Sequence, residues 1–159
     1  MITLAYARHL WAYTAWAHVR VFQALESVAT SPSPRFGQMV GLMSHVVRAE
    51  EVWLARIRQE PSSGRPLWPE DPLPSVRERA EASQAAWTAF LDSAAPHALT
   101  ETVAYTNTRG HPFTSVLSDI VVHVAHHGTH HRGQVLTLLR ADGHTPPALD
   151  YIYYTRRSA

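Results

Sequence analysis

Apolar residues recur every three or four positions along four long segments, the spacing of one buried helix face. The first segment runs from about Thr3 to Val28. It ends before Pro32, because the residue that precedes a proline is disfavoured in helical conformation. Its inward stripe is expected to be Trp11, Ala15, Val19, Phe22 and Leu25.

The second predicted helix runs from about Pro34 to Gln59. Ser33 suits the N-cap, and Pro34 suits the first helical position, where its missing N–H costs nothing. The expected inward stripe is Leu42, Val46, Ala49, Val52, Trp53 and Ile57.

The last two predicted helices follow a proline-rich stretch. One begins with the capping-box pattern Ser75–Glu78 and reaches about Asp92. Its inward positions are expected to include Ala82, Ala86 and Phe90. The other runs from about Ser115 to Ala141, with Asp119 in an early turn and Gly143 placed to end it in a left-handed conformation.

The connections predict how the helices are arranged. The first two helices are joined by a few residues and should be antiparallel neighbours. The linker Glu60–Pro74 holds five prolines and can reach ~45 Å, whereas a 25-residue helix is ~38 Å long. The third helix can therefore start parallel to the second. Residues Glu101–Phe113 indicate a short hairpin, and Asp150–Tyr154 an ordered tail laid on the helices.

Length and composition narrow the class of protein. The 159 residues fit one domain, residues 1–159, and a formal charge of +1 disfavours a nucleic-acid partner. The absence of cysteine excludes disulfides, thiolate metal sites and a cysteine nucleophile. No apolar run is long enough to span a membrane, and the first residues do not resemble a signal peptide, so a cytoplasmic location is expected.

Histidines carry the candidate chemistry. Five of the 11 histidines lie within residues 123–131. At about 100° per residue, His127 and His131 point toward the core face of the fourth helix, while His126 points away. Two imidazoles at i and i+4 are the helical way to bind one metal ion, as in zincins, but Gly128 occupies the position of the zincin glutamate. Peptide hydrolysis therefore loses support, although a small residue there leaves room beside a metal.

A third ligand is expected from the second helix, where His45 lies among apolar residues. Three neutral imidazoles leave open positions on one divalent ion, and they suit Zn, Ni or Fe. The alternative for any single inward histidine is a hydrogen-bonded core residue. A second metal site at His126 and His130 is disfavoured, because both should face solvent or an interface.

Other residues are weaker candidates for the site. His123 is a candidate for contact with a substrate or a metal ligand. Arg132 is a candidate for binding an anionic substrate group, and a structural ion pair is its alternative use. Trp11, Trp16 and Trp53 have helical spacing and are expected in the core, where one or two of them could wall a pocket over the metal. His18 is treated as incidental, and no general base is evident because Glu50 and Glu51 project away from the face that carries His45.

Several motifs resemble the DinB family, which includes the YfiT-like metal-dependent hydrolases. His127–Gln134 resembles the family's His-x-x-x-His-Arg-Gly-Gln helix, and Phe36–Leu54 resembles its second helix. Tyr13–His18 is similar to the family's Tyr-x-x-Trp-Ala-Asn, with histidine in place of asparagine. Asn107–Gly110 and Pro146–Asp150 also fit, so the resemblance covers nearly the whole chain.

The resemblance implies an all-α, up-down-down-up four-helix bundle and often a homodimer. It also implies one divalent metal held by His45, His127 and His131, the same residues that helical geometry selects. The leading hypothesis is a metal-dependent enzyme that activates a water or a small-molecule thiol, acting as a thiol S-transferase or a hydrolase. Without cysteine, any thiol must come from a small molecule. The rival hypothesis is a non-catalytic, stress-responsive metal-binding protein, which would have a closed site rather than an open one.

Overall fold

Four long helices make up most of the structure, a computed structural model that describes residues 2–62 and 64–156. They are α1 (Leu4–Val28), α2 (Phe36–Ile57), α3 (Leu73–Ser93) and α4 (Leu117–Ala141). A two-stranded sheet of β1 (Thr102–Thr106) and β2 (Pro112–Val116) precedes α4, and a short helix, α5 (Tyr151–Thr155), follows it. The chain is therefore mostly helical rather than strictly all-α, because the predicted hairpin forms an antiparallel pair.

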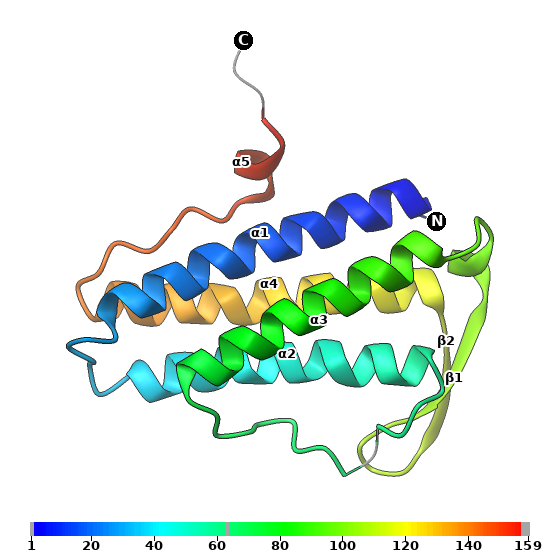
Figure 1. The fold of residues 1–159 in the computed structure, drawn as a ribbon, viewed down its shortest axis with the longest axis horizontal. Helices are drawn as coiled ribbons and strands as arrows, with labels where there is room; N and C mark the ends of the chain where they lie inside the picture. Colours follow the sequence, from blue (N-terminus) through cyan, green and yellow to red (C-terminus); the bar gives the residue numbers. More distant parts are fainter. Residues whose placement is uncertain (1, 63, 157–159) are drawn as a thin grey trace.

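Each long helix packs mainly against two others. Helices α3 and α4 both contact α1, and both also contact α2. Helices α1 and α2 are antiparallel as predicted, but they contact each other only weakly, so the prediction that they are close neighbours is wrong. In Figure 1, α1 and α4 run from right to left, whereas α2 and α3 run from left to right. The linker after α2 returns along the molecule, so that α3 starts beside the beginning of α2, as the length of the linker permits. The predicted linker includes residue 63, which lies outside the described residues.

The observed helix starts correct two predictions. Helix α2 begins at Phe36 rather than Pro34, and its N-cap is Arg35. Ser33 instead accepts a hydrogen bond from the Arg35 N–H and donates one to Asp142 beyond the end of α4. Helix α3 begins at Leu73, ahead of the predicted capping box, because Pro74 in the first turn has the helical φ and needs no N–H partner.

The buried faces also differ from the predicted stripes at some positions. Val19 is 52% exposed, whereas Trp11, Phe22 and Leu25 are buried as predicted. On α3, Ala82 is exposed and Phe90 only partly buried. The buried stripe of α3 consists of Leu73, Val76, Ala80, Ser83, Trp87 and Leu91. Ser83 and Trp87 reach a polar cluster in the interior, which is described below.

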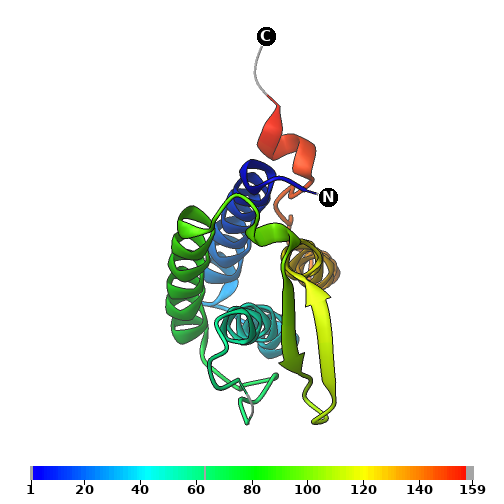
Figure 2. The ribbon, with the colours of Figure 1, turned by 90° about the vertical axis from the view of Figure 1, so that its right-hand side faces the viewer.

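The C-terminal end of α4 and the tail match their predictions, whereas α4 starts at Leu117 rather than about Ser115, because Ser115 and Val116 belong to β2. Asp119 lies in the first turn of α4, and Gly143 has a φ of 83° just beyond its end. The tail packs on α1, where the Tyr13 hydroxyl donates a hydrogen bond of 2.8 Å to the Leu149 carbonyl. In Figure 2, α5 lies on the outer side of α1, and the hairpin stands beside the start of α4. Among the described residues, no helix is both long and apolar enough to cross a membrane.

Candidate metal centre

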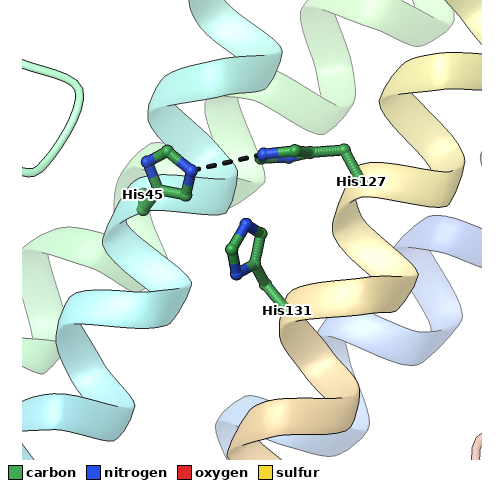
Figure 3. Close-up of side chains that lie close together, drawn as sticks. All are labelled: His45, His127 and His131. Atoms are coloured by element: carbon green, nitrogen blue, oxygen red, sulfur yellow. Dashed lines mark hydrogen bonds between the residues drawn. The ribbon is translucent and has the colours of Figure 1, made fainter.

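Three histidine side chains converge between α2 and α4. His45 comes from α2, and His127 and His131 come from successive turns of α4 (Figure 3). One ring nitrogen of each can be chosen so that all three lie within 4.8 Å of one another. The structure therefore brings together the three residues that the i, i+4 spacing and the inward position of His45 select.

Hydrogen bonds orient two of the three rings. His45 Nδ1 lies 2.8 Å from the Leu67 carbonyl oxygen, and His131 Nδ1 lies 2.7 Å from Gln134 Oε1. Because both partners are assigned as acceptors, each Nδ1 carries the proton, and each Nε2 keeps its lone pair for a metal. This is the arrangement in which an outer hydrogen bond fixes the tautomer and direction of a ligating imidazole.

Burial keeps His45 and His127 in the neutral form that binds metals. The pKa of His127 is lowered to about 4, first because its ring is partly buried and then because of the neighbouring His131 and His45. Burial also lowers the pKa of His45, against the opposing effect of its hydrogen bond to Leu67. Because a neutral imidazole is required for metal binding, His45 and His127 are ready to act as ligands at neutral pH.

The spacing of the nitrogens fits a metal ion. His45 Nε2 and His127 Nε2 are 3.2 Å apart. Two nitrogens bound to one tetrahedral Zn²⁺ at ~2.05 Å are separated by ~3.3 Å, so these two already have the spacing of ligands. Without an ion, one of the two must carry a proton to avoid facing lone pairs. The cluster can therefore hold a divalent ion, with His131 as its third donor.

Gly128 makes room for the Arg132 side chain next to the histidines. A Cβ at this position would lie 2.9 Å from Arg132 Nη1, whereas Val46 Cγ1 on α2, at 3.6 Å, would be at an ordinary contact distance. The space beside Gly128 is occupied by the Arg132 guanidinium, which corrects the expectation that a small residue there leaves room beside the metal.

Trp68, in the linker, covers one side of the cluster. Its ring stacks on the His45 ring with centroids 3.8 Å apart and an interplanar angle of 4°. His45 is only 8% exposed, whereas Trp68 itself is 57% exposed. The place of Trp68 beside the cluster could not be predicted, because the linker has no periodicity from which a side chain's direction can be inferred.

A cavity opens on the other side of the cluster. This inner cavity has a volume of about 350 Å³, and both His45 and His127 line it. Trp53 and the hairpin residues Tyr105 and Phe113 form its aromatic walls. It continues into an outer cavity of about 1120 Å³, which shares Arg56, Tyr105 and Phe113 with it. The prediction that a tryptophan walls a pocket beside the metal is met by Trp53, while Trp11 is buried in the core and Trp16 packs against Tyr154.

The two weaker candidates for the site, His123 and Arg132, lie in different surroundings. His123 is exposed, and its ring centroid is 5.8 Å from that of His127 and 5.4 Å from that of Trp53. Arg132 points into the interior and is 1% exposed. Neither residue is among those that line the inner cavity. His126 and His130 are exposed, as predicted.

A buried polar cluster lies among the four long helices, and the sequence analysis did not anticipate it. Glu50 and His18 are both buried, with Glu50 Oε1 3.6 Å from His18 Nε2. Ser83 donates a 3.0 Å hydrogen bond to the other oxygen of Glu50, and Arg132 Nη1 lies 3.4 Å from His18 Nε2. Each long helix thus contributes one residue, so the cluster fixes the helices relative to one another.

Burial determines the protonation of this cluster. It raises the pKa of Glu50 to about 8, against the smaller opposing effects of Ser83 and Arg132. Burial, and then the charge of Arg132, lowers the pKa of His18 well below its usual value. Near neutral pH, Glu50 therefore keeps its proton and His18 is uncharged. Glu50 Oε1 has no hydrogen-bond partner among the described residues, because His18 Nε2, at 3.6 Å, is too far away to form one.

Compared with a Glu50→Gln variant, the free energy of unfolding of the chelator-treated protein should fall by about 2 kcal/mol between pH 6.5 and 8. The pKa of Glu50 is about 8 in the folded chain and about 4.3 in the unfolded chain, so stability is lost as pH rises through this window. The lowered pKa values of His18, His45 and His127 act in the opposite direction, because the unfolded imidazoles still lose protons just above pH 6.5, and the comparison with the variant cancels their effect. Urea unfolding at several pH values measures the slope.

Two variants separate this effect from other titrations. Glu50→Gln should not show the fall that Glu50 causes, because the amide has no proton to release. Glu51→Gln is the matched control. It removes the adjacent carboxylate, which pairs with Arg48 and Arg79 near the surface, and should keep the wild-type slope. A wild-type slope that persists in Glu50→Gln would contradict the assignment.

The fold and the site together define the class of protein. It is a mostly helical protein with a candidate metal centre, formed by three histidines between α2 and α4 beside a cavity. The chain belongs to the DinB family, whose family model matches residues 1–158. No curated protein and no solved structure matches the chain.

Proposed function

We propose that this protein is a metal-dependent enzyme of the DinB family. It would activate a water molecule or a small-molecule thiol at a divalent ion held by His45, His127 and His131. The ion would be Zn, Ni or Fe, since three imidazoles suit each of them. S-transfer of a thiol to an electrophile is the first choice of reaction, and hydrolysis is the second.

The main observation in support of this proposal is that the histidine cluster borders a cavity. A structural site is closed by its protein ligands, whereas a catalytic site keeps a position for water or substrate. Here three side chains supply three nitrogens, and His45 and His127 line the inner cavity of about 350 Å³. That volume is in the range of small-molecule sites.

The chain's own residues position the reactants. Leu67 and Gln134 orient the rings of His45 and His131, and Trp68 shields one face of His45. A divalent ion bound there supplies the positive charge that lowers the pKa of a bound water or thiol. The aromatic walls Trp53, Tyr105 and Phe113 would exclude water from the apolar part of a substrate.

Metal analysis of protein purified without an affinity tag tests the site. The wild type should hold about one divalent ion per chain, and His45→Ala and His131→Ala should lose most of it, because two imidazoles bind far more weakly than three. His130→Ala is the matched control, because this exposed histidine lies next to His131. Full metal content in both ligand variants would show that the site is wrong.

A screen of small thiols with an electrophilic acceptor tests the reaction. Turnover that requires both the metal and one thiol would support a transferase, and turnover with water alone would support a hydrolase. A protein that holds its metal but shows no turnover with any thiol or hydrolysable substrate would favour the non-catalytic binding protein.

The topology, oligomeric state and cellular location of the protein are also part of the proposal. We infer that the four long helices form the up-down-down-up four-helix bundle implied by the family resemblance, with residues 1–159 as one domain. Formation of a homodimer and a cytoplasmic location also stay predictions. Analytical ultracentrifugation tests the first and fractionation of cells the second.

A further inference from the structure

Arg56 is the one permanently charged side chain among the described residues that line the inner cavity. It lies in the last turn of α2, and the same cavity is lined by His45 and His127. Within the described part of the chain, no aspartate or glutamate lines this inner cavity, whereas the exposed Glu60 lines only the outer one. The space next to the histidine cluster is therefore electropositive.

The guanidinium of Arg56 is held in place but has no anionic partner. Its Cζ lies 4.7 Å from the ring centre of Trp53 and 5.2 Å from that of Tyr105. Among the described residues it forms no ion pair, and its buried Nε has no hydrogen-bond partner. Arg48 and Arg79, by contrast, both bind Glu51. The cation–π contacts fix the position of Arg56 but provide no acceptor for its N–H groups.

A structural role does not account for this arrangement. A positive charge in the last turn interacts favourably with the negative end of the helix dipole, but a flexible, exposed arginine would provide the same interaction. Arg56 is instead partly buried, which lowers its pKa from the usual value. It stays charged at neutral pH, because a guanidinium does not lose its proton in proteins. A partly desolvated cation with unused donors is a preformed site for an anion.

We propose that Arg56 binds a carboxylate of the substrate, so that the cavity takes a small organic acid whose other end reaches the histidine cluster. A carboxylate matches a single guanidinium in charge and in its pair of acceptor oxygens. The aromatic walls suit an apolar or unsaturated body between the two ends. The second half of this proposal rests on the proposed function, whereas recognition of the carboxylate does not require the metal.

Binding of a matched acid and amide tests the proposal. The probes are 3-phenylpropionate and 3-phenylpropionamide, titrated into metal-free protein while the tryptophan fluorescence is followed, because Trp53 lines the cavity. The wild type should bind the carboxylate about tenfold more tightly than the amide, as expected for charge-assisted hydrogen bonds at a partly exposed site. Equal affinities, or no binding of the acid, would overturn the proposal.

Variants assign the preference to Arg56. Arg56→Met should lose the tenfold preference, and Arg56→Lys should keep only part of it because it retains the charge without the planar fork. Arg58→Met is the matched control, since this exposed arginine just beyond the end of α2 lies outside both cavities and should keep the preference. A preference that survives in Arg56→Met would overturn the assignment.

Metal content separates this proposal from the proposed function. Arg56→Met should hold as much metal as the wild type, because Arg56 lies outside the histidine cluster. Loss of acid preference with metal retained supports the role of Arg56. If the histidine site is wrong, the ligand variants keep their metal while the difference between acid and amide is unaffected.

Discussion

Replacing Arg132 with alanine should lower the free energy of unfolding by about 3–5 kcal/mol. The side chain is 1% exposed, so truncation leaves a large cavity among the helices. Its Nη2 donates a 2.9 Å hydrogen bond to Thr129, and its Nη1 lies 3.4 Å from His18. Removal therefore also leaves buried polar groups without a partner, which adds to the cost of the cavity. Urea unfolding of the chelator-treated protein measures the loss.

Two further variants identify the source of this effect. Arg140→Ala is the matched control. It removes an exposed arginine of the same helix and should cost less than about 1 kcal/mol. Arg132→Met keeps most of the side-chain length without the charge and should cost less than Arg132→Ala, because packing is partly restored. If Arg132→Ala were as stable as Arg140→Ala, the buried cluster would not hold the helices together.

The histidine cluster was the most predictable part of the site. An i, i+4 pair on one face of a long helix has its geometry set by the helix alone, so His127 and His131 need no tertiary information. His45 needed one further step, that its helix faces α4. That step succeeded because α2 carries a broad apolar face, which has to pack on a neighbour.

The buried polar cluster could not be found by the same reasoning. Hydrophobic periodicity predicts that charged residues face solvent, so it predicts exposed side chains for Glu50 and Arg132. In the structure both are only 1% exposed. Their burial depends on partners contributed by other helices. Those are His18 on α1 and Ser83 on α3, and the choice of neighbours follows from the tertiary arrangement. One feature of the sequence did indicate that Glu50 and Arg132 are buried: each lies three or four positions from an apolar residue of the buried face.

The cavity walls escaped prediction for a related reason. The hairpin was predicted from its alternation and turn residues, but nothing in those features says which helix it packs on. In the structure, β1 contacts α2 and places Tyr105 over Arg56. A charged residue at the end of a helix thereby becomes part of a cavity only through a segment about 50 positions away.

Adding Zn²⁺ or Ni²⁺ at a free concentration of 100 times its dissociation constant should raise the free energy of unfolding by about 2.7 kcal/mol. We expect the ion to bind where the three imidazoles meet, and this arrangement exists only when α2 and α4 are packed together. His127→Ala should abolish the increase, because His127 Nε2 faces His45 Nε2 at 3.2 Å and is central to the ligand set. Chelation should return the wild type to its metal-free stability, and thermal or urea unfolding measures both changes.

His126→Ala is the control for this experiment, because it removes the neighbouring imidazole from the same helix. His126 is exposed and lies outside the cluster, so this variant should keep the whole increase. An increase that survives in His127→Ala would place the metal elsewhere, for example on surface histidines. Equal increases in the wild type, His127→Ala and His126→Ala would likewise show that the metal binds outside the cluster. A loss confined to His127→Ala would link metal binding to the packing of α2 against α4, since only the folded chain holds the three nitrogens within reach of one ion.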